Sequence, residues 1–183
     1  KDAIQLCEVD AHLEDVSALK ISPKKQVTLH EAVEKNDVDL VKLILSEGAD
    51  KDEKNKMLKQ TPLYIAASNG YIDIMKVLLD AGANKDLPCG TQHLSPLHAA
   101  AMYNQPDAVQ VLLDRDVDID NVQRDRAAQG SPAYWAATRG SVDALKVLQK
   151  AGCDLTKVQA GLEVYEKSKI IDYTNLSDYR VAG

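Results

Sequence analysis

The fold is decided by residues 61–86, TPLYIAASNGYIDIMKVLLDAGANKD. The Thr61-Pro62 pair marks a helix start, because Pro at the first helical position loses no hydrogen bond within the helix. This helix is expected to end at Gly70, which adopts the left-handed conformation at little steric cost. Over residues 71–81 the apolar side chains recur with helical periodicity. The stretch therefore predicts two short antiparallel helices followed by a turn-rich arm.

The same pattern recurs along the chain. Its leucine falls at Leu29, Leu63 and Leu97, with Ala133 in the equivalent place, at spacings of 34, 34 and 36 residues. Each second helix repeats an Asp followed by a short aliphatic run, and most copies close on a Gly-Ala-Asp-like triplet. A regular period of this length predicts stacked helical units that share one continuous core.

The motif at residues 95–100, SPLHAA, and its copies carry the T-P-L-H-x-A signature with a period near 33 residues. The chain thus resembles the ankyrin-repeat family, closely over residues 27–156 and weakly on either side. The resemblance implies an all-α solenoid of stacked helix-turn-helix pairs with protruding β-turn arms. It also implies a protein without enzymatic activity of its own that offers a rigid surface to another protein.

We expect one domain over residues 1–183, because a solenoid forms one elongated core. Four repeats are predicted at 27–60, 61–94, 95–130 and 131–160. Residues 1–26 are interpreted as a shortened helical pair that caps the N-terminal end, and residues 161–183 as a C-terminal cap. Terminal units depart from the pattern because one of their faces meets water.

Composition argues against several classes of partner. The formal net charge of −6 disfavours nucleic acid or an anionic membrane surface as the main partner, since both require a basic face. No apolar run approaches the length of a membrane span. Cys7 and Cys153 have the setting of small hydrophobic residues. We expect a monomer. Its location is undetermined, with the cytoplasm slightly favoured and export left open because the chain begins at Lys1.

Residues suited to catalysis or metal binding are sparse. The chain has no Gly-rich phosphate loop, HExxH motif or CxxC pair. The resemblance implies that His30 and His98 hydrogen-bond neighbouring backbone. Cys89, His93 and His98 come nearest to a zinc site, but a polar arm is favoured because His98 is expected to be occupied inside its repeat. An enzyme that uses Cys89 and His93 ranks last, and no catalytic residue, metal or cofactor is predicted.

The informative side chains occupy the variable positions of each first helix. These positions are i, i+3 and i+4, so they share one helix face, which the resemblance assigns to a concave groove. In chain order they are Glu31, Glu34, Lys35; Ile65, Ser68, Asn69; Ala99, Met102, Tyr103; and Trp135, Thr138, Arg139. The groove is thus expected to change from charged near the N-terminus to aromatic and apolar near the C-terminus.

A partner-binding patch is predicted at the C-terminal end of this groove. Its expected centre consists of Met102, Tyr103, Trp135 and Arg139. Ile65 and four arm residues would extend it: Met57, Leu58, His93 and Leu94. The prediction rests on Trp, Tyr and Arg, the residue types that dominate binding energy at interfaces. The alternative is that Trp135 packs beneath the C-terminal cap, against Tyr165.

Two functions remain open at this point. The first is a stand-alone binder that masks, inhibits or anchors a partner protein through the groove and arm tips. The second is the recognition domain of a larger multidomain protein whose effector region is absent from this chain.

Overall fold

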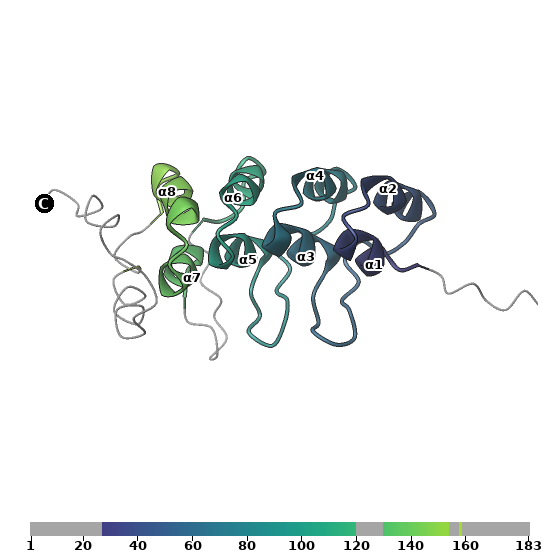
Figure 1. The fold of residues 1–183 in the computed structure, drawn as a ribbon, viewed down its shortest axis with the longest axis horizontal. Coiled ribbons are helices and arrows are strands. Elements are labelled where there is room, and N and C mark those ends of the chain that lie inside the picture. The colour runs from purple at the N-terminus through teal and green to yellow at the C-terminus, as the bar shows by residue number, and fades with distance from the viewer. Residues whose placement is uncertain (1–26, 120–129, 154–157, 159–183) are drawn as a thin grey trace, which may run out of the picture.

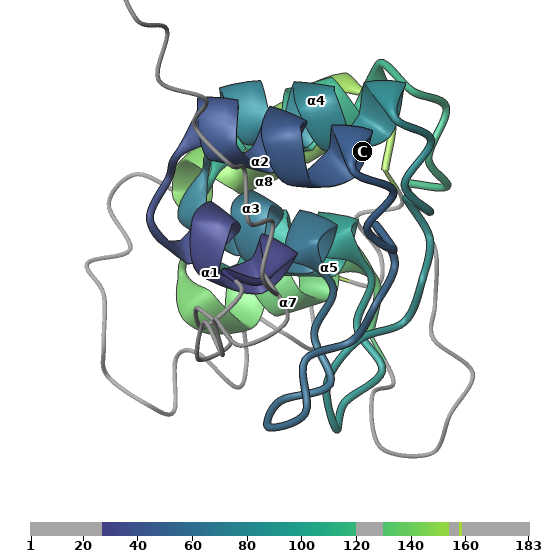
Figure 2. The same cartoon turned by 90° about the vertical axis from the view of Figure 1, so that its right-hand side faces the viewer.

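The computed structural model describes residues 27–119, 130–153 and 158, and within them eight helices form four antiparallel pairs (Figure 1). The inner helices are α1 (Leu29–Glu34), α3 (Pro62–Asn69), α5 (Pro96–Met102) and α7 (Pro132–Arg139). The outer helices are α2 (Val38–Ser46), α4 (Ile72–Asp80), α6 (Pro106–Leu113) and α8 (Val142–Lys150). The predicted all-α stack is confirmed, with one inner and one outer layer (Figure 2).

Two arms project from the inner layer, away from the outer helices (Figures 1 and 2). The first arm spans residues 47–61 and the second residues 81–95. Part of the arm between α6 and α7, residues 120–129, lies outside the described residues, and so do the predicted caps at 1–26 and 161–183. Of the helices described, none is long and apolar enough to cross a membrane.

Local residues set the helix ends. Thr61 begins α3 by accepting a hydrogen bond from Tyr64 N at 3.2 Å, and Pro62 occupies the first helical position. Gly70 ends α3 with φ of +70°, as the sequence predicts. Asn36 and Asn104 replace this glycine in the first and third repeats, with φ of +54° and +52°. Asn tolerates the left-handed region better than other residues that carry a Cβ, so the sharp turn between paired helices is kept.

The core is one continuous cluster of aliphatic side chains that extends from Leu29 to Val158. Most of the largest fully buried side chains are aliphatic, such as Leu63 and Ile74. Small residues recur where one inner helix faces the next, because alanine lets two backbones approach closely. Each helix pair buries its apolar faces against its neighbours, so a repeat depends on the stack for its stability.

Hydrogen bonds between successive repeats hold the arms together. His30 Nε2 donates to the backbone carbonyl of Gln60 at 3.0 Å, just before the next inner helix. Asp52 accepts a hydrogen bond from Asn84 N at 2.8 Å and so joins the bases of the two arms. These contacts link equivalent points about one repeat apart, which fixes the register of the stack.

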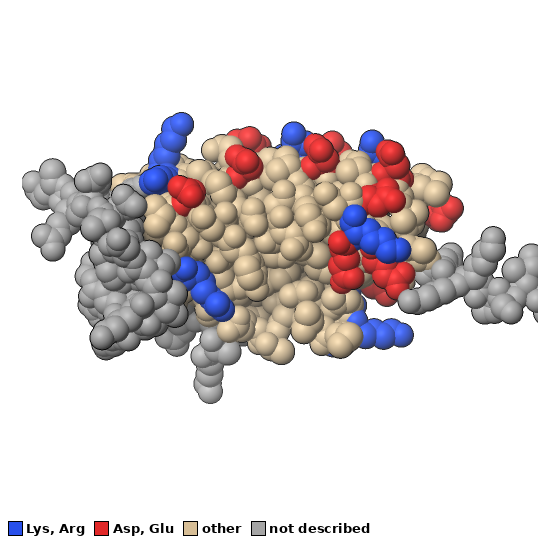
Figure 3. All heavy atoms as spheres, in the orientation of Figure 1, with Lys and Arg blue, Asp and Glu red and all other residues tan. Residues whose placement is uncertain are grey.

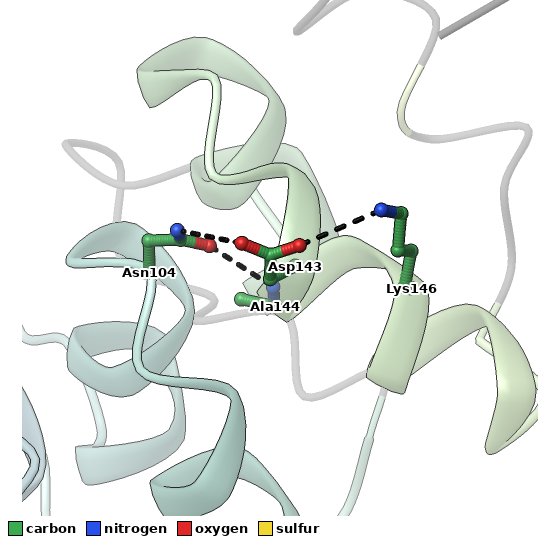
Figure 4. Close-up of polar contacts among 4 residues, drawn as sticks. All are labelled: Asn104, Asp143, Ala144 and Lys146. Atoms are coloured by element: carbon green, nitrogen blue, oxygen red, sulfur yellow. Dashed lines mark hydrogen bonds and ion pairs between the residues drawn. The ribbon is translucent and has the colours of Figure 1, made fainter. Parts of the chain in front are cut away.

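The junction between the third and fourth repeats is joined by a side chain that crosses it (Figure 4). Asn104 Oδ1 accepts from Ala144 N at 3.1 Å, and Asn104 Nδ2 donates to Asp143 Oδ2 at 3.4 Å. The N-cap residue of α8, Ser141, makes no cap hydrogen bond because its hydroxyl donates to the Met102 carbonyl at 3.0 Å. Asn104 therefore caps a helix that belongs to the next repeat.

Candidate interaction surface

The nine predicted contact residues fall into three groups by exposure. Five are exposed: Met57 (91%), Leu58 (58%), His93, Tyr103 (53%) and Arg139. Trp135 is half-buried, and three residues are buried: Ile65, Leu94 and Met102. The exposed surface is therefore narrower than the sequence suggested, and the last three side chains belong to the packing beneath it.

Leu94 and Met102 are buried because the second arm folds against the inner helices. A satellite cluster separate from the main core contains Tyr64, Cys89, Leu94, Ala99 and Met102. The backbones of Cys89 and Leu94 pair in an antiparallel bridge, with both N···O distances at 2.9 Å. This bridge turns both side chains toward α3 and α5, where they pack on the face that the variable positions share. Ile65 packs instead in the main core.

Trp135 packs against the same satellite cluster. Its ring meets Tyr134 edge to face, with centroids 6.0 Å apart and an interplanar angle of 88°. The indole Nε1 is buried and has no hydrogen-bond partner among the residues that the structure describes. The indole therefore packs at least partly against the preceding repeat. The alternative contact with Tyr165 lies outside the described residues.

An exposed row runs along the ends of the inner helices. We call it the inner-helix row. Its four members occupy the same motif position in consecutive repeats: Lys35, Asn69, Tyr103 and Arg139. Tyr103 is its only aromatic member, and its side chain makes no hydrogen bond among the described residues. Charged side chains gather over α1 and along the outer helices, whereas the surface over α3 and α5 is largely uncharged (Figure 3).

Tyr64 lies beneath this row in the position that histidine holds in the motif. Burial raises the pKa of Tyr64 to about 12, and the nearby Tyr103 and Cys89 add to the shift. A phenol with this pKa stays neutral at physiological pH. Tyr64 therefore supports the surface as a packed ring and supplies no ionised group.

The candidates for metal binding or catalysis have structural partners. His98 Nε2 donates to the Gly130 carbonyl at 3.2 Å, and its Nδ1 accepts from the Ser95 hydroxyl at 2.7 Å. The Cys89 thiol donates to the Leu87 carbonyl at 3.2 Å. Across the described part of the chain, no three His, Cys, Asp or Glu side chains are grouped so as to hold a metal ion. The role implied for the motif histidines, bonding to neighbouring backbone, matches the bonds that His30 and His98 make.

Sequence reasoning missed two features of this surface. The satellite cluster escaped notice because burial of Leu94 depends on how the arm folds, although the apolar pair Cys89 and Leu94 across a Gly-containing turn was a usable signal. Three lysines that surround Met57 and Leu58 in the first arm were also passed over, because the net charge of the chain is negative.

Comparison with known proteins identifies the family of the chain. A family model of ankyrin repeats, three copies long, matches residues 29–125 and matches again at 95–159. No curated protein matches the chain. Ankyrin repeats generally mediate protein–protein interaction, and proteins built from them are typically non-enzymatic interaction modules. The matched repeats span most of the chain and coincide with the four helix pairs, so the chain belongs to the ankyrin-repeat family.

Proposed function

We propose that this chain binds a partner protein through the C-terminal half of the inner-helix row, with Tyr103 as the anchor and Arg139 beside it. Binding there would mask, inhibit or anchor the partner. The observation that carries the proposal is the exposure of Tyr103: this aromatic residue is 53% exposed at the C-terminal end of α5.

The surroundings of Tyr103 support this role. Packed side chains lie beneath it, since Tyr64 and Met102 are buried in the satellite cluster. A rigid ring loses little conformational entropy on binding, and a folded scaffold adds little ordering cost. Arg139 supplies a planar group suited to carboxylates at the neighbouring position of the row. An aromatic residue flanked by a guanidinium is typical of the centre of an interface.

The test is a capture experiment with matched variants. Tyr103→Ala and Arg139→Ala are combined in one protein, and Leu43→Ala and Lys76→Ala in a control. Leu43 is 54% exposed, almost the same as Tyr103, but both control residues lie on outer helices. Proteins captured by the wild type and by the control, but not by the row variant, are candidate partners.

The affinity of such a partner for the wild type and the variants then gives the binding free energy that Tyr103 contributes. Loss of the Tyr103 ring is expected to weaken binding by about 2 kcal/mol, close to 30-fold. Circular dichroism and the thermal midpoint should stay near wild type, because neither row side chain is buried. If every captured protein binds the row variant as tightly as the control, the row is not the binding site.

A further inference from the structure

The tip of the first arm, residues 54–59 (KNKMLK), combines two features found together nowhere else among the described residues. Met57 and Leu58 are adjacent apolar side chains at 91% and 58% exposure. Three lysines surround them, Lys54, Lys56 and Lys59, and all three are exposed. Two bare apolar side chains at the end of a projecting arm cost solvation free energy, so this exposure calls for a binding role.

The tip is held in a fixed shape. Asn55 Oδ1 accepts from Leu58 N at 3.0 Å and from Gln60 N at 3.2 Å, which closes the turn. The Lys59 carbonyl accepts from Gly90 N at 3.0 Å, and Lys54 Nζ donates to the Pro88 carbonyl at 2.6 Å. The second arm therefore braces the first, and Met57 and Leu58 are presented at the apex without further ordering.

The two arm tips carry no negative charge of their own, although the net charge of the whole chain is −6. No acidic residue occurs in 54–60 of the first arm or in 87–95 of the second, where Thr91, Gln92 and His93 are exposed. Glu53 is the nearest acidic residue along the chain. The other acidic residues of these two arms lie toward their bases, at Glu47, Asp50, Asp52 and Asp86, and Figure 3 shows further acidic side chains over α1 and the outer helices. Salt screens charges beyond about 8–10 Å, so the residues near the tip govern what it attracts: three lysines against the one carboxylate of Glu53.

We propose that the first arm tip docks on an anionic lipid surface. Met57 and Leu58 enter the boundary between head groups and acyl chains, while Lys56 and Lys59 lie in the plane of the lipid phosphates and Lys54 holds the first arm against the second. A convex tip with apolar residues at the apex and flexible ammonium groups around it matches a fluid anionic interface. The uncharged second tip can approach the same surface without repulsion.

The contact is expected to be weak, reversible and sensitive to salt. Each lysine near an anionic membrane strengthens binding about fivefold, and two short apolar side chains add a small insertion term. This contact is separate from the inner-helix row, so the chain could hold a protein partner at a membrane. Failure of either proposal leaves the other intact.

The test is co-sedimentation of the whole chain with vesicles of phosphatidylcholine, with and without phosphatidylserine. The wild type should sediment only with the phosphatidylserine vesicles and should be released by high salt. Lys56→Gln with Lys59→Gln should weaken binding about 25-fold, the effect of two lysines. Met57→Ser with Leu58→Ser should also lower binding. A control with Leu43→Ser and Lys76→Gln should bind like the wild type.

Three results would overturn the proposal. The first is no sedimentation of the wild type with phosphatidylserine vesicles while circular dichroism shows a folded chain. The second is tip variants that bind as well as the control. The third is binding to polyglutamate that matches the vesicles, with no effect of the Met57 and Leu58 changes, which would make the tip a site for acidic polypeptides. Because the substituted side chains are exposed, folding of the variants is expected to be preserved.

Discussion

Asn104 offers the sharpest test of how the repeats are joined. In Asn104→Ala the chain loses the side chain whose oxygen accepts from Ala144 N, in the first turn of α8 (Figure 4). Ser141 does not supply a replacement while its hydroxyl bonds the Met102 carbonyl. The first turn of α8 is then left with an unsatisfied amide, and the fourth repeat loses one of its polar links to the third.

Two costs add up in this variant. Removing a helix cap destabilises a protein by about 1 kcal/mol. Ala also tolerates the left-handed backbone less well than Asn, because it lacks the short polar side chain that can hydrogen-bond locally, and this costs roughly 1 kcal/mol more. We expect Asn104→Ala to lower the free energy of unfolding by about 2 kcal/mol in total.

Asn36 provides a matched control for the backbone part. It holds the same place in the first repeat with φ of +54°, and its side chain caps none of the helices that the structure describes. Asn36→Ala should therefore cost only about 1 kcal/mol. Glycine removes the backbone cost at both positions, so the difference between Asn104→Gly and Asn36→Gly gives the cap energy by a second route.

Urea unfolding measures these differences. Far-UV circular dichroism follows all the helices, while the single tryptophan, Trp135 on α7, reports on the fourth repeat. Stacked repeats can unfold one at a time from an end. In Asn104→Ala the fluorescence transition should therefore move to lower urea than the circular dichroism transition. Equal losses for the two alanine variants, together with equal changes for the two glycine variants, would show that the crossing side chain contributes nothing.

Three further predictions concern buried or strained residues. Because the pKa of Tyr64 is raised to about 12, folding favours its neutral form. The stability that this side chain contributes is present below pH 10 and is lost as the pH rises toward 12. Over this window the free energy of unfolding should fall by up to about 2 kcal/mol more in wild type than in Tyr64→Phe. His98→Ala removes a fully buried ring with hydrogen bonds on both nitrogens, so we expect a loss of at least about 2 kcal/mol in urea unfolding; a loss near zero would show that the ring is not a link between repeats. Gly70→Ala should lower the thermal midpoint more than Gly48→Ala: both have positive φ, but only at Gly70 would the new Cβ strike a side chain, that of Gln105.

Much of the fold could be predicted because its signals are local. Thr61, Pro62 and Gly70 satisfy or end a helix through their own backbone chemistry, so helix α3 begins and ends where the sequence indicates. The period of the repeats then implied the stack, since a helix pair with one apolar face has to bury it against a copy of itself. In the first repeat the motif locates the helix start only to within one residue. Thr28, at the motif's Pro position, caps α1, so α1 starts one residue later in the motif than α3.

The candidate surface was only partly predictable. Helical spacing placed Met102, Tyr103, Trp135 and Arg139 on one face, but it did not say which of them another segment would cover. The second arm folds back through the Cys89–Leu94 bridge and buries part of that face, which leaves Tyr103 and Arg139 exposed.

The sequence by itself determined the helices, their pairing and the period of the stack, because caps, left-handed residues and apolar spacing act within one repeat. Only the tertiary structure decided which side chains meet water, and that Asn104 caps a helix 40 residues away. Exposure and contacts between repeats depend on where distant segments come to rest in space, and a pattern confined to one repeat carries no record of that.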